Sequence, residues 1–211
     1  MITLRGKGHL VGQRRVERDA AKTMRRNLLV MMTIIGELLA CTGLSPGRVK
    51  HDPLTPEEHV TFGLAYEAKG RPELAAREYD AALQQEHSYL PAMVGLGNLA
   101  FERGALEEAE AYYQQALAIA PKDPGANNNL AMLYLTRGAS LEEAEQLARQ
   151  ALEQGGPLRP YALDTLARIY ARQRRYQEAQ AALEEAQALA PSGNTLLRQR
   201  LVQLREELGG N

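Results

Sequence analysis

The stretch "LGNLAFERGALEEAEAYYQQALAIAP", residues 96–121, decides the fold of this chain. Shifted back by 34 residues, it falls on "FGLAYEAKGRPELAAREYDAALQQEH" at 62–87. Shifted forward by 34, it meets "LAMLYLTRG" at 130–138 and, after one extra residue, "SLEEAEQLARQAL". A fourth copy, "LARIYARQRRYQEAQAALEEAQALAP", occupies 166–191. Self-similarity at a fixed spacing predicts a stack of structural repeats.

The repeated positions show what each copy forms. Apolar residues recur at spacings of three and four, which predicts two amphipathic helices in each copy. Small residues recur where the helices cross and let the two backbones approach. They are Gly63, Gly97, Ala131 and Ala167 in the first helices, and Ala75, Ala109, Ala144, Ala179, Ala82, Ala116, Ala151 and Ala186 in the second helices. Tyrosines fill the larger gaps: Tyr66, Tyr79, Tyr113, Tyr134 and Tyr170.

This pattern resembles the tetratricopeptide repeat. The resemblance implies an all-α fold, a right-handed α-solenoid of about four helix pairs, because one pair cannot bury its apolar face alone. We expect the repeats to span 55–193. Their predicted boundaries are 56–89, 90–123, 124–159 and 160–193.

Two features complete the predicted solenoid. Residues 194–211 form a capping helix and tail, since Leu196, Leu197, Leu201 and Leu204 share one stripe. The glycine between the two helices of a copy, seen at Gly70, Gly104 and Gly138, is replaced by Arg174 in the fourth copy.

Charge and cysteine content exclude several classes of protein. Residues 1–41 carry 8 basic and 3 acidic residues, which leaves 17 basic and 23 acidic residues in 42–211. An acidic body argues against a nucleic-acid partner, because phosphates need cations to neutralise them. The single cysteine, Cys41, can form neither an internal disulfide nor a zinc site by itself.

The N-terminal segment has the layout of a secretory signal: "MRRN" precedes the apolar "LLVMMTIIGELLA" and Cys41. The apolar run is shorter than the roughly 20 residues of a membrane-spanning helix. Residues 38–41, Leu-Leu-Ala-Cys, resemble the lipobox of bacterial lipoproteins, which implies lipid attachment at Cys41. We expect a signal region at 1–40 with its true start at Met24, followed by a tether at 41–54. The alternative is a buried helix with Cys41 as a small apolar residue.

The sequence offers little that would support catalysis. "GLGNLA", residues 95–100, matches a dinucleotide-binding fingerprint, but it lies inside a repeat helix and not after a strand. The four histidines lack ligand spacing for zinc. Acid pairs such as Glu107-Glu108 begin second helices, where the helix dipole favours negative charge. We therefore expect no enzyme activity, no cofactor, no metal and no small-molecule substrate.

The resemblance also implies where a partner binds, on first-helix residues that face the concave side. The residues predicted to contact the partner are Asn98, Phe101, Asn128, Met132, Leu135, Asp164, Arg168 and Arg172. Amide side chains donate and accept hydrogen bonds at once, so they suit the backbone of an extended peptide. Arg168 and Arg172 lie on one helix face and suit carboxylates, so the hypothesis places an acidic end of the partner there. The neighbouring Asn127 and Asn129 are candidates for the same role. The alternative for Asn129 is a hydrogen bond between helices.

Together these inferences predict a membrane-anchored scaffold that binds a protein or peptide partner. Tetratricopeptide lipoproteins include pilotins, which help assemble type IV pilus secretins, so we expect a role in assembling an envelope or secretion complex. Thr42 is not the Asp that retains such lipoproteins at the inner membrane, so we expect the periplasmic face of the bacterial outer membrane. The alternatives are an accessory subunit of an exported enzyme, such as a peptidase, and a cytoplasmic adaptor without lipid.

Replacing the lipid-bearing residue tests this expectation. Cys41→Ser removes the thiol that would carry the lipid, so the protein should leave the membrane fraction. A single acyl chain binds membranes only at about 10⁴ M⁻¹, whereas two or more hold a protein stably. Fractionation with mass spectrometry of the N-terminal peptide measures both effects. Recovery of the unaltered chain in the cytosol, with a free thiol at Cys41, would contradict the prediction.

Overall fold

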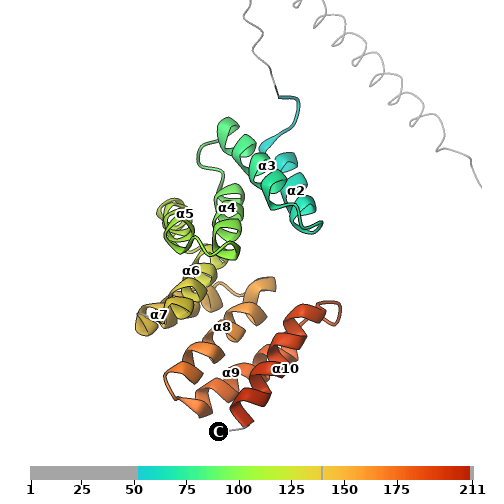
Figure 1. The fold of residues 1–211 in the computed structure, drawn as a ribbon. Coiled ribbons are helices and arrows are strands. Elements are labelled where there is room, and N and C mark those ends of the chain that lie inside the picture. The colour runs from blue at the N-terminus through green and yellow to red at the C-terminus, as the bar shows by residue number, and fades with distance from the viewer. Residues whose placement is uncertain (1–51, 139, 210–211) are drawn as a thin grey trace, which may run out of the picture. The chain divides into compact units, whose positions relative to one another are not determined.

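The computed structural model describes residues 52–138 and 140–209, which are helical apart from short connections and contain no strand. The predicted signal region, Cys41 and nearly all of the tether lie outside the described residues. The helices follow one another in pairs (Figure 1). One pair occupies each predicted repeat range, except that α8 begins one residue before the fourth range, at Arg159. The pairs are α2 (Pro56–Glu67) with α3 (Pro72–Gln85), α4 (Leu90–Glu102) with α5 (Leu106–Ile119), α6 (Pro124–Arg137) with α7 (Leu141–Glu153), and α8 (Arg159–Arg172) with α9 (Tyr176–Leu189).

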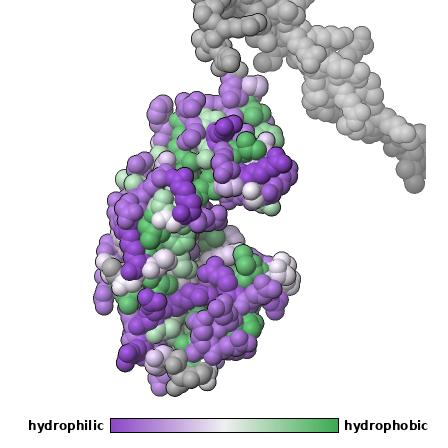
Figure 2. Space-filling view, in the orientation of Figure 1, coloured by the Kyte–Doolittle hydropathy of each residue, from purple (hydrophilic) through white to green (hydrophobic). Residues whose placement is uncertain are grey.

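Two further elements lie in the C-terminal part. A short 3-10 helix, η1 (Gly156–Leu158), leads into α8, and α10 (Thr195–Gly209) follows the last pair. The predicted all-α solenoid is thus confirmed. A space-filling view shows a hollow bordered by α2 and α10 (Figure 2). No described helix is both long and apolar enough to cross a bilayer.

Local sequence signals set where the helices begin. Thr55 caps α2: its hydroxyl accepts from the Glu58 N–H at 3.2 Å, and its own N–H donates to the Glu58 carboxylate at 2.8 Å. This reciprocal arrangement satisfies two backbone donors that have no partner within the helix. Asp123 caps α6 in the same sense, accepting from the Ala126 N–H at 2.7 Å. Every first helix has a proline in its first turn, where the missing N–H costs nothing: Pro56, Pro91, Pro124 and Pro160.

The ring of Tyr79, on α3, sets how closely α2 and α4 approach. A Cβ atom added to Gly63 or Gly95 would overlap this ring, and at Gly95 the separation would be 2.7 Å. Tyr113 of α5 repeats the arrangement one copy later, where a Cβ on Gly97 would come within 2.5 Å of its ring. Only glycine fits these positions. The glycines of "GLGNLA" therefore serve helix crossing, as their place inside a repeat helix predicts.

The repeated alanines are buried, as predicted. Ala109 is inaccessible to solvent, whereas Ala111, two residues further along α5, is exposed. The equivalent alanines of the other copies are also buried, so the repeat register deduced from sequence holds along the chain. Tyr79, Tyr113 and Tyr170 are buried in the helix pairs, while Tyr66 and Tyr134 are half-buried.

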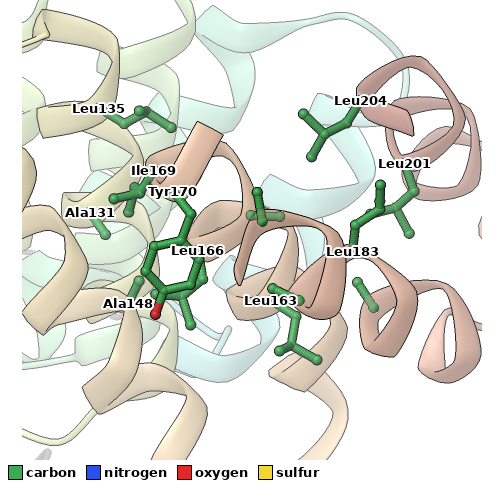
Figure 3. Packing of buried hydrophobic residues seen from close by; sticks show 14 of the residues in the cluster. Ala131, Leu135, Ala148, Leu163, Leu166, Ile169, Tyr170, Leu183, Leu201 and Leu204 are labelled. Carbon is green, nitrogen blue, oxygen red and sulfur yellow. The ribbon is translucent and has the colours of Figure 1, made fainter. Parts of the chain in front are cut away.

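Helix α10 caps the solenoid by burying Leu197, Leu201 and Leu204. These side chains join residues of α8 and α9, including Leu163 and Leu183, in one apolar cluster (Figure 3). The prediction that Leu196 shares the buried stripe is wrong, since 67% of its surface is exposed. Leu196 lies about 100° around the helix from Leu197, on the exposed side of α10.

The turns inside the repeats explain the loop glycines and their one exception. Gly70, Gly104 and Gly138 have φ angles of 66°, 80° and 68°, a left-handed conformation that glycine adopts without penalty. Arg174 takes the same conformation, with φ of 61°, although it has a Cβ. Its side chain makes no hydrogen bond or ion pair with any residue in the described ranges. The fourth repeat therefore retains the turn at the expense of backbone strain.

Arg174→Gly should stabilise the fold. The left-handed conformation costs an L-residue roughly 1–2 kcal/mol, and the greater freedom of glycine in the unfolded chain returns about 0.5–1 kcal/mol of this. We expect the free energy of unfolding to rise by roughly 0.5–1 kcal/mol, measured by urea denaturation.

Gly104→Ala is the matched control. No atom lies within 4 Å of the added Cβ, so only backbone strain acts. This variant should lose about 1 kcal/mol. A lower free energy of unfolding in Arg174→Gly would show that the Arg174 side chain stabilises the fold and would contradict the prediction.

Candidate functional site

A pocket of about 280 Å³ lies on the side formed by the first helices of the repeats. Residues of α4, α6 and α8 form its middle, and α5 contributes Tyr113. Helices α2 and α10 contribute its two ends, and the space-filling view shows the hollow between them (Figure 2). The lining residues are Glu67, Asn98, Phe101, Glu102, Tyr113, Asn128, Asn129, Met132, Tyr161, Asp164, Thr165 and Arg200.

Three asparagines, Asn98, Asn128 and Asn129, form a chain of side-chain hydrogen bonds that we call the amide ladder. The Asn98 Oδ1 accepts from the Tyr113 hydroxyl at 2.9 Å and from the Asn129 Nδ2 at 2.7 Å. Asn128 donates to the Asn129 Oδ1 at 3.4 Å and accepts from the Thr165 hydroxyl at 2.9 Å. The hydrogen bond between helices considered for Asn129 is therefore present, and the ladder joins α4, α6 and α8.

The ladder leaves amide donors available in the pocket. The Asn98 Nδ2 has no hydrogen-bond partner among the described residues, and its side chain is half-buried. The Asn128 Nδ2 makes a single long hydrogen bond. Asn127 differs, because it is fully buried and donates to the carbonyls of Pro121 and Asp123, which fixes the start of α6. Asn98 and Asn128 therefore line the pocket with donor capacity to spare for a ligand, whereas the Asn127 amide is used within the fold.

A buried ion cluster stands at the α10 end of the pocket. The Asp164 carboxylate is only 1% exposed and accepts from the Arg168 Nε at 2.9 Å. Its second oxygen accepts from the Arg200 Nη2, and Arg168 also donates to the Arg200 backbone carbonyl at 3.3 Å. Arg168 is thus occupied within the fold, while Arg200 lines the pocket. The cluster of two arginines and one aspartate has a net charge of +1.

The opposite end carries two carboxylates, Glu67 and Glu102, that we call the acidic wall. The Tyr79 hydroxyl donates to the Glu67 Oε1 at 2.6 Å. Burial raises the pKa of Glu67, the Tyr79 hydroxyl lowers it, and the negative Glu102 raises it, with a net upward shift. Burial and the hydrogen bond to Glu67 also raise the pKa of Tyr79, so the phenol remains protonated and continues to donate.

The structure divides the residues predicted to contact a partner into two groups. Leu135 lies in the apolar core with 7% of its surface exposed, Arg168 is held by Asp164, and Arg172 is exposed beside the Gly138 turn. None of these three lines the pocket. The residues that do line it are Asn98, Phe101, Asn128, Met132 and Asp164.

Sequence reasoning missed Arg200, Glu67 and Glu102. The leucine stripe of 194–211 predicts only a helix that covers the last repeat, and it assigns no ligand to the polar residues of that helix. A signal existed, since Arg200 adjoins Leu201 and follows Leu197 by three, which puts it at the edge of the buried stripe. Glu67 and Glu102 are the last residues of α2 and α4, and they do not occupy equivalent positions of the repeat, so the sequence pattern does not mark them.

The ion cluster makes an asymmetric prediction about stability. Replacing both Arg168 and Arg200 with Met leaves a buried carboxylate uncompensated, which should cost about 3 kcal/mol or more. Asp164→Asn leaves only partly exposed arginines, which can turn to water, so it should cost about 1 kcal/mol. Urea denaturation at neutral pH measures both. An equal or greater loss for Asp164→Asn would contradict the assignment of Asp164 as a buried ion.

Comparison with known proteins identifies the fold family. The tetratricopeptide-repeat family matches the chain over residues 60–124, 100–169 and 160–192. A thermophilic tetratricopeptide-repeat protein of Thermus thermophilus is 22% identical with a TM-score of 0.63, over 73% of this chain and 83% of that one. PilF of Pseudomonas aeruginosa is 19% identical with a TM-score of 0.63, over 74% of this chain and 69% of that one. At these identities the two structures show a shared fold.

A curated human protein is also similar in sequence. Protein O-mannosyl-transferase TMTC1 of Homo sapiens is 34% identical over 153 residues, 70% of this chain. The chain spans only 17% of that relative. The helix pairs, their glycine and alanine crossings, and the family matches agree, and the chain belongs to the tetratricopeptide-repeat family, whose fold serves as a scaffold for protein–protein interaction.

Proposed function

We propose that this chain is a scaffold that binds an extended segment of another protein in the pocket between α2 and α10. The observation that carries the proposal is the amide ladder. It lies in an open pocket, spans three repeats, and retains unused donors on Asn98 and Asn128. An extended backbone presents carbonyl oxygens and N–H groups at regular intervals, and amide side chains can pair with both.

The remaining lining residues suit a peptide better than a small polar molecule. Phe101 and Met132 offer apolar surface beside the ladder, and methionine adapts to side chains of different shape. The ladder is fixed by its own hydrogen bonds before a ligand arrives. A preorganised surface loses less conformational entropy on binding, which favours affinity.

The membrane anchor is part of the same proposal. The lipobox-like residues 38–41 and the tether that follows support attachment through Cys41, at the periplasmic face of an outer membrane. An anchored scaffold gains effective concentration toward partners on the same membrane. We propose that it assists the assembly of an envelope or secretion complex.

Peptide selection tests the binding site. Ten-residue peptides selected from a displayed random library on the full chain should lose about tenfold in affinity on Asn98→Ala with Asn128→Ala, because each lost hydrogen bond costs roughly 0.5–1.5 kcal/mol. Fluorescence anisotropy with labelled peptides measures the change.

Gln115→Ala with Gln150→Ala is the matched control. Both glutamines are exposed, lie on the second helices α5 and α7, and make no hydrogen bond with the described residues. This double variant should bind as the unaltered protein does. If both double variants bind alike, the ligand does not use the amide ladder and the proposed site is wrong.

A further inference from the structure

We propose that the pocket selects its partner by charge at both ends. The occupant is an extended protein segment with a cationic side chain beside the acidic wall and a carboxylate beside Arg200. This inference rests on the proposed function, because it specifies the chemistry of the segment that the amide ladder binds. It replaces the expectation from sequence that Arg168 and Arg172 receive an acidic end.

The acidic wall lacks a cation of its own. Within residues 52–138 and 140–209, neither Glu67 nor Glu102 makes an ion pair, whereas the ion pairs found there join other carboxylates to arginine or histidine. Both side chains line the pocket, and Glu67 is half-buried and fixed by Tyr79. Two like charges in one pocket repel each other. A cationic side chain of the partner would relieve this repulsion.

The α10 end of the pocket has a net positive charge. Asp164 neutralises one of its two arginines, and the Arg200 side chain remains 39% exposed. Arg200 uses one nitrogen, Nη2, on Asp164, and no second side-chain partner occurs in the described chain. A guanidinium has five N–H donors in a planar arrangement that matches a carboxylate. The other donors of Arg200 can therefore bind an acidic group of the partner.

Asp164 acts as a positioning residue for Arg200. It holds the guanidinium of Arg200 at the edge of the pocket through a partly buried hydrogen bond. If the partner draws Arg200 toward its own carboxylate, Arg168 still pairs with Asp164 at 2.9 Å. The buried charge then keeps a counter-ion, so ligand binding avoids the penalty of an isolated buried carboxylate.

The neutral amide ladder lies between the charged groups contributed by α2 and α10. A segment with opposite charges at its two ends is attracted by both the acidic wall and Arg200. A segment with charges of only one sign is repelled by one of these two groups. Repulsion of wrong partners gives specificity as effectively as attraction of the right one. Partial enclosure also weakens the screening of these charges by salt.

Selection from the random ten-residue library tests this inference on the full chain. Peptides selected on the unaltered protein should carry one basic and one acidic residue at separate positions. Peptides selected on Arg200→Gln should no longer require the acidic residue. Peptides selected on the double variant Glu67→Gln with Glu102→Gln should no longer require the basic residue. Each variant should bind the original peptides about tenfold more weakly, as expected for losing one charge-assisted hydrogen bond.

Matched controls separate charge recognition from general charge effects. Arg198→Gln changes an exposed arginine on the same helix as Arg200, and Glu142→Gln with Glu143→Gln changes two exposed glutamates of α7. These controls should keep the selected pattern and affinity. A glutamine at position 200 can still donate to Asp164, and a glutamine at position 67 can still accept from Tyr79. Thermal unfolding of each variant checks that the fold is retained.

The outcomes distinguish the inference from the proposed function. Selected peptides that depend on Asn98 and Asn128 but carry no paired charges would overturn the charge inference and leave the function standing. The charge inference is also overturned if Arg200→Gln and Arg198→Gln behave alike. Failure to select any peptide that depends on the amide ladder would overturn the proposed function, and the charge inference with it.

Discussion

The contact of the Tyr79 ring with the backbones of two helices is the constraint on which the rest of the structure depends. Gly63 and Gly95 leave room for one aromatic ring and nothing more, so α2 and α4 can approach only at this register. Tyr113 and Gly97 repeat the constraint in the next copy. A rigid ring between bare backbone segments fixes helix spacing more firmly than flexible side chains can.

The same tyrosines connect the core to the pocket. The Tyr79 hydroxyl ends at Glu67 and the Tyr113 hydroxyl ends at Asn98, both of which line the pocket. Each ring is buried while its hydroxyl reaches a polar partner. The same tyrosines consequently set the helix spacing and the orientation of two pocket-lining side chains, so a change in the core would alter the pocket.

Periodicity made most of the fold predictable, because each repeat satisfies the same local rules. The register placed Ala109 at a helix crossing, where it is buried, and it brought Asn98 and Asn128 to one surface. Arg200 was missed, since it comes from outside the repeats and reaches Asp164 across 36 residues of sequence. Pairings of this kind depend on tertiary structure, which a single sequence does not display.

The central claim is that a partner segment lies along the amide ladder, and side-chain amide NMR spectra of the full chain test it most directly. On titration with a selected peptide, the Nδ2–H₂ resonances of Asn98 and Asn128 should shift, because their donors are available in the pocket. The chemical shift of the Asn127 amide should not change, since this amide is buried and donates to two backbone carbonyls. Unchanged Asn98 and Asn128 signals, with shifts confined to exposed residues of α5 and α7, would contradict the account.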